Sequence, residues 1–217
     1  MLKRISLFTD LFLLNLTNKK IEKDAKNLKF PYYLIYFLVY IEDKRFYYHF
    51  GLDFIAILRA FIMNCLGKNI QGGSTILQQL YDIKEMKKNK EYIRKRKIIR
   101  KISQIIFLKN FFMLSKQKIL REYLRNVYLG KKIYGIEEAS QYYFKKDILS
   151  LNKNECFILI EKIASPNKIR IKRIKNILSR YAIRKVFSQE ELNILLNKYL
   201  EEEKNGRRTT WKRKKLC

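Results

Sequence analysis

The sequence predicts a mainly α-helical protein. Glycine and proline, the residues that most often end helices, number only 7 and 2 among 217 residues, and long stretches of the chain contain neither. Apolar residues make up 47% of the chain, which is enough for the core of one domain. We expect a basic and apolar N-terminal segment over residues 1–30, one helical domain over residues 31–200, and a basic, disordered tail over residues 201–217.

The charge balance predicts an anionic partner. The formal net charge is +28 at pH 7, which favours a membrane surface, a nucleic acid or a pyrophosphate-bearing lipid. Residues 84–101 hold ten Lys or Arg against two Glu, with Tyr92 as their only aromatic residue. Because a nucleic-acid surface would need a known module or interleaved aromatic residues, nucleic acid is the least favoured of the three.

The first 30 residues contain a short apolar piece, residues 5–16, that Asp10 interrupts. A bilayer-spanning helix needs about 20 apolar residues, and no small-residue cleavage site of a signal peptide follows the piece. We therefore expect neither a transmembrane anchor nor a signal peptide, but a piece that lies in a membrane interface. The residues expected at that interface are Phe8, Leu11, Phe12 and Leu14.

Residues 31–70 predict one or two helices. The run over residues 32–41 is almost wholly apolar and leads into Glu42, so we expect the end of a helix there that is either buried or interfacial. Further on, large apolar residues recur at helical spacing and favour a stripe that packs in the core over one that contacts a membrane. This stripe consists of Phe54, Ile57, Leu58, Phe61, Ile62 and Leu66.

The stretch over residues 42–80 holds the side chains best suited to chemistry. Glu42 stands at the rim of the apolar run, where partial desolvation makes a carboxylate a better proton acceptor. On a continuing helix Phe46 would lie on the same face as Glu42. His49, the only histidine, would lie one turn beyond Phe46. After a Gly-Gly pair, we expect Ser74 to cap a helix whose free N–H groups face an anion. A lone histidine or a capped turn is usually structural, but this order and spacing favour a site.

The rest of the chain also predicts helices, over residues 107–114, 116–128, 151–163 and 170–200. The three cysteines show no metal-ligand spacing. Cys65 and Cys156 lie in apolar surroundings, so we expect both to be buried, unreactive thiols.

Two motifs carry a resemblance to a known family. The first reads E-D-x-x-F-x-x-H-x-G and is filled by Glu42, Asp43, Phe46, His49 and Gly51. The second reads G-G-S-T-I-T-Q-Q-L, and residues 72–80 match it at every position except Leu77. In both motifs the sequence resembles the peptidoglycan glycosyltransferases of family 51, the polymerase modules of penicillin-binding proteins and their monofunctional relatives.

The resemblance continues through residues 30–190. Arg100 and Lys101 match the basic start of the third motif, R-K-x-x-E. Residues 115–130 follow the fourth motif, residues 134–144 follow the fifth, and residues 164–167 resemble the end of the family's domain. Five motifs in the same order as in the family are not expected from an accidental resemblance.

The resemblance implies a lysozyme-like glycosyltransferase domain with two lobes and a cleft between them, over residues 31–200. It implies polymerisation of lipid II, in which the acceptor sugar 4-hydroxyl attacks a polyprenyl-pyrophosphate donor with inversion. Glu42 would be the catalytic base, with Asp43 and His49 beside it in the catalytic set. The residues implied in substrate binding are Phe46, Ser74, Thr75, Gln78, Gln79, Arg100, Lys101 and Gln104.

The implied partners follow from the same family. They are lipid II, the growing glycan on its polyprenyl pyrophosphate, an anionic membrane surface and cell-wall synthesis proteins. A divalent metal, Mg²⁺ or Mn²⁺, is compatible with the region of Glu42, although the sequence assigns no ligand set; no organic cofactor is implied. The implied location is peripheral on the bacterial cytoplasmic membrane, whose outer face is where the family works. In the family a hydrophobic patch near the region of residues 31–70 enters the lipid, which implies the same for part of the apolar stripe.

Four positions depart from the family's pattern. The third-motif Glu is Gln104, and a Lys that follows the second motif is Asp82. In the fourth motif, I-L-E-x-Y-L-N, the Glu is Arg121 and the Asn is Arg125. A Glu-to-Gln change keeps shape but removes charge, and an acid at a pyrophosphate-facing Lys position places like charges together.

The departures leave other functions open. One is a degenerate family member that binds lipid II or a cell-wall partner without polymerising glycan. A basic nucleic-acid-binding protein is supported by charge alone. A glycan hydrolase is weaker still, because Gln104 removes the obvious second carboxylate.

Overall fold

The structure is a computed structural model that describes residues 2–65, 73–88 and 114–214. Within these residues the chain is helical, and a single isolated β-bridge joins Tyr128 to Tyr134, so the predicted mainly α class is confirmed. The helices are α1 (Leu2–Leu28), α2 (Tyr32–Glu42), α3 (Phe54–Cys65), α4 (Ile76–Lys88), α6 (Lys116–Asn126), α7 (Ile136–Phe144), α8 (Lys153–Ala164), α9 (Ile171–Leu178), α10 (Tyr181–Val186) and α11 (Gln189–Lys214), with 3₁₀ turns at Phe46–Tyr48 and Ile148–Ser150.

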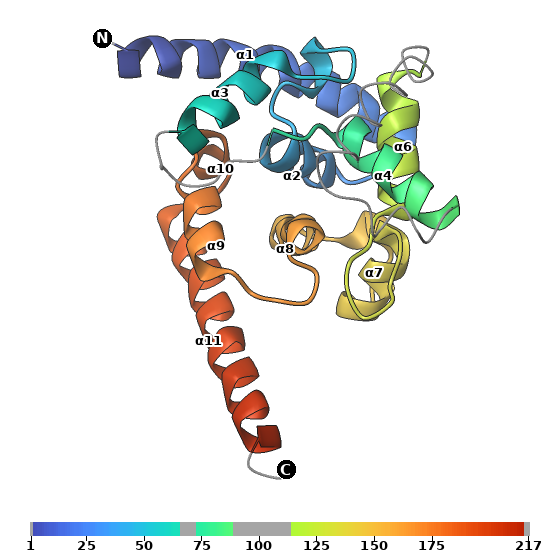
Figure 1. The fold of residues 1–217 in the computed structure, drawn as a ribbon, viewed down its shortest axis with the longest axis vertical. Helices are drawn as coiled ribbons and strands as arrows, with labels where there is room; N and C mark the ends of the chain where they lie inside the picture. The colour runs from blue at the N-terminus through green and yellow to red at the C-terminus, as the bar shows by residue number, and fades with distance from the viewer. Residues whose placement is uncertain (1, 66–72, 89–113, 215–217) are drawn as a thin grey trace.

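Helix α2 lies at the centre of the molecule, next to α8 (Figure 1). Pro31 precedes its first residue, and every side chain from Leu34 to Ile41 is buried. The Phe37 ring lies 5.4 Å from Phe157 of α8 and 5.5 Å from Phe187, which follows α10. The helix predicted there is therefore present and buried, and it ends at Glu42.

The second half of α1 belongs to the core. Leu14, Ile21, Ala25 and Leu28 are all buried, and α1 packs against α2. This corrects the expectation that Leu14 lies in a membrane interface. The side chains expected there at positions 8, 11 and 12 lie outside the described set. Among the helices of the described ranges, none has the length and apolar character needed to cross a membrane.

Helix α3 is the largest correction to the predicted core. Phe54 is 73% exposed and Leu58 is 59% exposed, whereas the small residues Ala56 and Ala60 face inward and are buried. Gly73 crosses this inner face, and a Cβ there would lie 3.2 Å from the Ala56 carbonyl oxygen. The described large side chains of α3 therefore point outward, because the inner face admits only close backbone packing. Phe61 and Leu66 of the predicted stripe lie outside the described side chains.

Residues 171–214 fold as three helices rather than one long segment. On α9 the predicted in-phase residues Ile174, Ile177 and Leu178 are buried. The tail expected to be disordered is helical as far as Lys214, and residues 215–217 lie outside the described ranges.

The two described cysteines differ. Cys156 of α8 is buried, as predicted, but Cys65 at the end of α3 is exposed. The prediction for Cys65 was wrong because α3 turns its apolar residues away from the core.

Candidate active site

The site begins where α2 ends. The Arg180 side chain donates hydrogen bonds to the carbonyl oxygens of Tyr40 (3.3 Å) and Ile41 (3.2 Å), so a cation covers the negative end of the helix. The backbone leaves helical geometry at Asp43, with φ −149° and ψ 73°. Glu42 and Phe46 therefore do not share a helix face, which corrects the geometry expected from sequence.

Both oxygens of the Glu42 carboxylate are engaged. Gln79 Nε2 donates to Oε2 over 3.2 Å, and Arg173 Nη2 pairs with Oε1 over 3.0 Å. Gln79 is oriented by the buried Tyr123, whose hydroxyl donates to Gln79 Oε1 over 2.7 Å. Burial raises the pKa of Tyr123 well above its ordinary value, so this hydroxyl stays protonated and remains a donor.

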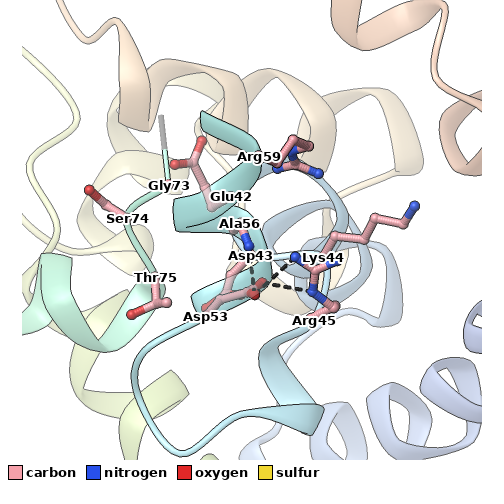
Figure 2. A pocket seen from close by; sticks show the side chains of 10 residues that line it. All are labelled: Glu42, Asp43, Lys44, Arg45, Asp53, Ala56, Arg59, Gly73, Ser74 and Thr75. Carbon is pink, nitrogen blue, oxygen red and sulfur yellow. Dashed lines mark hydrogen bonds and ion pairs between the residues drawn. The ribbon is translucent and has the colours of Figure 1, made fainter. Parts of the chain in front are cut away.

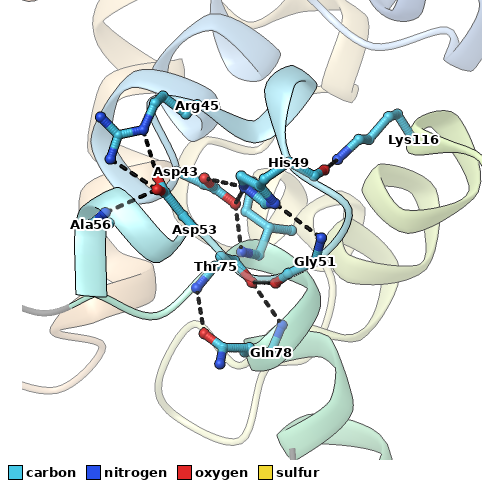
Figure 3. Close-up of polar contacts among 10 residues, drawn as sticks. Asp43, Arg45, His49, Gly51, Asp53, Ala56, Thr75, Gln78 and Lys116 are labelled. Atoms are coloured by element: carbon cyan, nitrogen blue, oxygen red, sulfur yellow. Dashed lines mark hydrogen bonds and ion pairs between the residues drawn. The ribbon is translucent and has the colours of Figure 1, made fainter. Parts of the chain in front are cut away.

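Asp43 and His49 form a second, buried pair. His49 Nε2 lies 2.9 Å from Asp43 Oδ1, and the Gly51 N–H donates to His49 Nδ1 over 3.0 Å. Because Nδ1 accepts a hydrogen bond, this network assigns the ring proton to Nε2. The Nε2–H then donates a hydrogen bond to Asp43. Figure 3 shows this network, in which Asp43 also accepts the N–H of Ile76, the first residue of α4 (3.0 Å).

The N–H groups at the start of α4 are hydrogen-bonded by groups of the protein itself. Thr75 Oγ1 accepts the Gln78 N–H (3.2 Å), and Gln78 Oε1 accepts the Thr75 N–H (3.0 Å), which is a capping box. Thr75 also donates to the Gly51 carbonyl over 2.6 Å. Thr75, not Ser74, is thus the capping residue, and Asp43 takes the place at this helix end that we expected for an external anion.

A small polar pocket opens beside Glu42. Figure 2 shows Glu42 at one side, pointing away from the Asp53–Arg45 pair. Arg45 holds both Asp53 oxygens at 2.9 Å, and Asp53 also accepts the Ala56 N–H of α3. Although burial acts in the opposite direction, these hydrogen bonds lower the pKa of Asp53. The lining residues are Glu42, Asp43, Lys44, Arg45, Asp53, Ala56, Arg59, Gly73, Ser74 and Thr75.

The arrangement does not fit a metal ion held by these residues. One ligand atom each of Asp43, His49 and Asp53 lies within 4.8 Å of the others. However, Arg45 occupies both oxygens of Asp53, and His49 contacts both oxygens of Asp43. A cation near Glu42 would meet the Arg173 guanidinium. We therefore derive no step through a metal.

Other residues implied in substrate binding lie in different surroundings. Phe46 is fully buried, and Lys116 Nζ lies 4.5 Å from its ring centre while donating to the His49 carbonyl over 2.6 Å. Burial lowers the pKa of Lys116 to about 8. Thr75 and Gln78 are buried, and Ser74 lines the pocket. The remaining three, Arg100, Lys101 and Gln104, lie outside the described residues.

Sequence reasoning missed the two arginines that hold Glu42 and its helix. Arg173 is 131 residues from Glu42, and Arg180 is 140 residues from Tyr40. The only signal was the amphipathic pattern around α9, which indicated a packed helix but not what Arg173, or Arg180 just after the helix, contacts. It missed Glu161 of α8 as well, a buried carboxylate near Arg173.

Comparisons of the sequence with known proteins show the family of this chain. A family model described as Transglycosylase matches residues 12–190. The chain is 39% identical to penicillin-binding protein 1A of Aquifex aeolicus over 142 residues, which is 64% of this chain and 19% of that protein. It is 42% identical to penicillin-binding protein 1B of Buchnera aphidicola subsp. Baizongia pistaciae over 148 residues (65% and 19%).

A longer match is to penicillin-binding protein 1A of Neisseria cinerea, 31% identical over 185 residues, 81% of this chain and 22% of that protein. The chain spans about a fifth of the length of these relatives. The chain belongs to the transglycosylase family, the family 51 domain of penicillin-binding proteins.

Proposed function

We propose that this chain is a peptidoglycan glycosyltransferase that polymerises lipid II into glycan strands. The observation that carries the proposal is the placement of Glu42. This carboxylate ends a fully buried helix, is oriented by Gln79 and Tyr123, and lines an open pocket. Membership of the family supplies the reaction class.

In the proposed reaction Glu42 accepts the proton of the acceptor sugar 4-hydroxyl as that oxygen attacks the donor anomeric carbon. The bond to the polyprenyl pyrophosphate breaks, and inversion follows from attack on the opposite face. Gln79 fixes the orientation of Glu42. Asp43 and His49 join the loop after α2 to the start of α4, so we give them a positioning role.

Cations beside the pocket suit the leaving pyrophosphate. Lys44 and Arg59 line it together with Glu42 (Figure 2), whereas Arg45 is already paired with Asp53. Positive charge near a developing phosphate anion stabilises the transition state. Arg100 and Lys101 are expected from the family resemblance to add to this charge.

We propose that the exposed apolar segment, residues 48–62, lies against an anionic membrane. Its exposed side chains are Tyr48, Phe50, Phe54, Ile55, Ile57, Leu58 and Ile62. Apolar residues that enter a membrane interface stabilise binding because they leave water. Each basic residue near anionic lipid adds about 1 kcal/mol to the binding free energy. The net charge of +28 favours that surface. Lipid II, the proposed substrate, is itself held in the bilayer.

A degenerate, non-catalytic family member is the second candidate. Gln104 and Asp82 remove or reverse charge at two motif positions, and Arg121 and Arg125 replace two more residues. In addition, Arg173 is paired with the proposed base. Such a protein would bind lipid II or a cell-wall partner without making glycan.

The test is a lipid II polymerisation assay in detergent with a divalent cation. We expect glycan from the wild type and at least a ~100-fold loss in Glu42→Gln, because a positioned base contributes about 10²–10⁴-fold. Glu201→Gln, an exposed carboxylate of α11 outside the family match, is the matched control and should retain activity. Lipid II binding is measured in parallel.

Each outcome separates the candidates. Glycan from the wild type that disappears in Glu42→Gln supports the enzyme and its base. No wild-type glycan, but glycan from Gln104→Glu with Asp82→Lys, identifies a polymerase that lost its chemistry at those positions. Lipid II binding with no glycan from any variant would establish the binding protein and reject the proposed reaction.

A further inference from the structure

Arg173 lies between two carboxylates that sequence motifs do not connect. Its Nη2 pairs with Glu42 Oε1 at 3.0 Å, while its Nε lies 4.0 Å from Glu161 Oε1. The three side chains come from α2, α8 and α9. Their exposures are 11% for Glu42, 3% for Glu161 and 27% for Arg173, so the guanidinium is the most accessible of the three.

The contact with Glu161 is incomplete. Both Arg173 Nε and Glu161 Oε1 are buried and have no hydrogen-bond partner among the residues that the structure describes. A separation of 4.0 Å is too long for a hydrogen bond. Buried polar atoms without partners are rare and unfavourable, and each requires an explanation. Here a shift of the guanidinium toward α8 would satisfy both atoms at once.

The contact with Glu42 opposes the proposed chemistry. A base that accepts a proton from a sugar hydroxyl needs an oxygen that the hydroxyl can approach. Each Glu42 oxygen already accepts one hydrogen bond, and the one on Oε1 comes from the bulky, charged guanidinium of Arg173. Gln79 is held by the buried Tyr123, so it is fixed in place. The long and partly exposed Arg173 is the partner that can withdraw.

We propose that Arg173 is a positioning residue with two alternative places, each beside a different carboxylate. It pairs with Glu42 in the resting protein and moves to pair with Glu161 when lipid II reaches the pocket. The inference rests on the proposed function. The move exposes one oxygen of Glu42, which keeps its hydrogen bond from Gln79, while Arg173 remains paired with a buried carboxylate. Burial also raises the pKa of Glu161, and the charge of Arg173 opposes that rise, so an arriving guanidinium favours the ionised carboxylate.

The kinetic test is a double-mutant cycle between Glu161→Gln and Arg173→Gln. In Glu161→Gln the second place of Arg173 is weakened, so we expect kcat to fall about tenfold with KM for lipid II within about twofold. In the Arg173→Gln background the same change should have no further effect on kcat. Lys175→Gln, an exposed cation on α9, should leave all values unchanged.

A second measurement does not depend on turnover. The Arg173 Nε–H resonance, assigned by its loss in Arg173→Gln, should shift when detergent-solubilised lipid II is added to the wild type. It should not shift in Glu161→Gln, whose unfolding midpoint is measured to show that the variant folds. An unmoved resonance in the wild type, or equal kcat losses in both backgrounds of the cycle, would overturn the proposal. By contrast, a wild type that makes no glycan but shows the shift would contradict only the proposed reaction.

Discussion

Helices α2 and α3 have similar lengths and are both strongly apolar, but the fold uses them in opposite ways. Helix α2 buries every side chain from Leu34 to Ile41 and presents Glu42 at its end. Helix α3 buries Ala56 and Ala60 and exposes the large residues that the structure describes there, such as Phe54 and Leu58. In α2 the neighbours are aromatic side chains of other helices, whereas Gly73 crosses the inner face of α3.

The comparison shows that apolar content does not determine burial. A helix that other helices surround can bury residues on all sides, but α3 is approached by backbone on the face of its small residues. In the proposed function the two helices also have different roles, one in catalysis and the other in membrane binding. Helix α2 fixes the position of the base, and α3 supplies the surface proposed to meet lipid.

The largest expected difference between the two regions is in thiol reactivity. In a Cys217→Ser background we expect Cys65, at the end of α3, to react readily with a maleimide. Cys156, in the helix packed on α2, should react at least about 1,000-fold more slowly, because burial raises its pKa to about 12 and the thiolate is the reactive form. Peptide mapping by mass spectrometry measures both rates. Similar rates would show that the core around α2 opens easily.

Core packing should separate the helices next. Phe37→Ala removes a buried ring that contacts Phe157 and Phe187 and should lower the free energy of unfolding by about 3–5 kcal/mol. Leu58→Ala in α3 should change it by less than about 0.5 kcal/mol because that side chain is already exposed. Denaturant unfolding measures both. A large loss in Leu58→Ala would mean that α3 packs against another part of the chain.

For membrane binding we expect substitutions in α3, which hardly affect stability, to have the large effect. Phe54→Ser with Leu58→Ser should weaken binding to phosphatidylglycerol vesicles at least about tenfold, because each buried apolar side chain contributes about 1.5–3 kcal/mol. The unfolding free energy should stay nearly constant. The matched control is Leu149→Ser with Ile194→Ser, two residues of similar exposure outside α3. Equal losses in both pairs would remove the special role of α3.

The sequence alone predicted much of the helical architecture and the family. Scarce glycine and proline, the apolar run before Glu42 and the in-phase residues of α9 reflect local physics, since periodicity and backbone preference act over a few residues. The catalytic roles assigned to Glu42, Asp43 and His49 remain predictions that the polymerisation assay tests.

Tertiary structure decided which surfaces these elements present and which distant groups meet. The exposure of Phe54 depends on a loop that crosses α3, and the caps on α4 involve Asp43, 33 residues away. The contact between Glu42 and Arg173 joins residues 131 positions apart, and no local pattern encodes such a distance. Burial and ion pairing depend on all neighbours in space, so they follow only once the helices are packed.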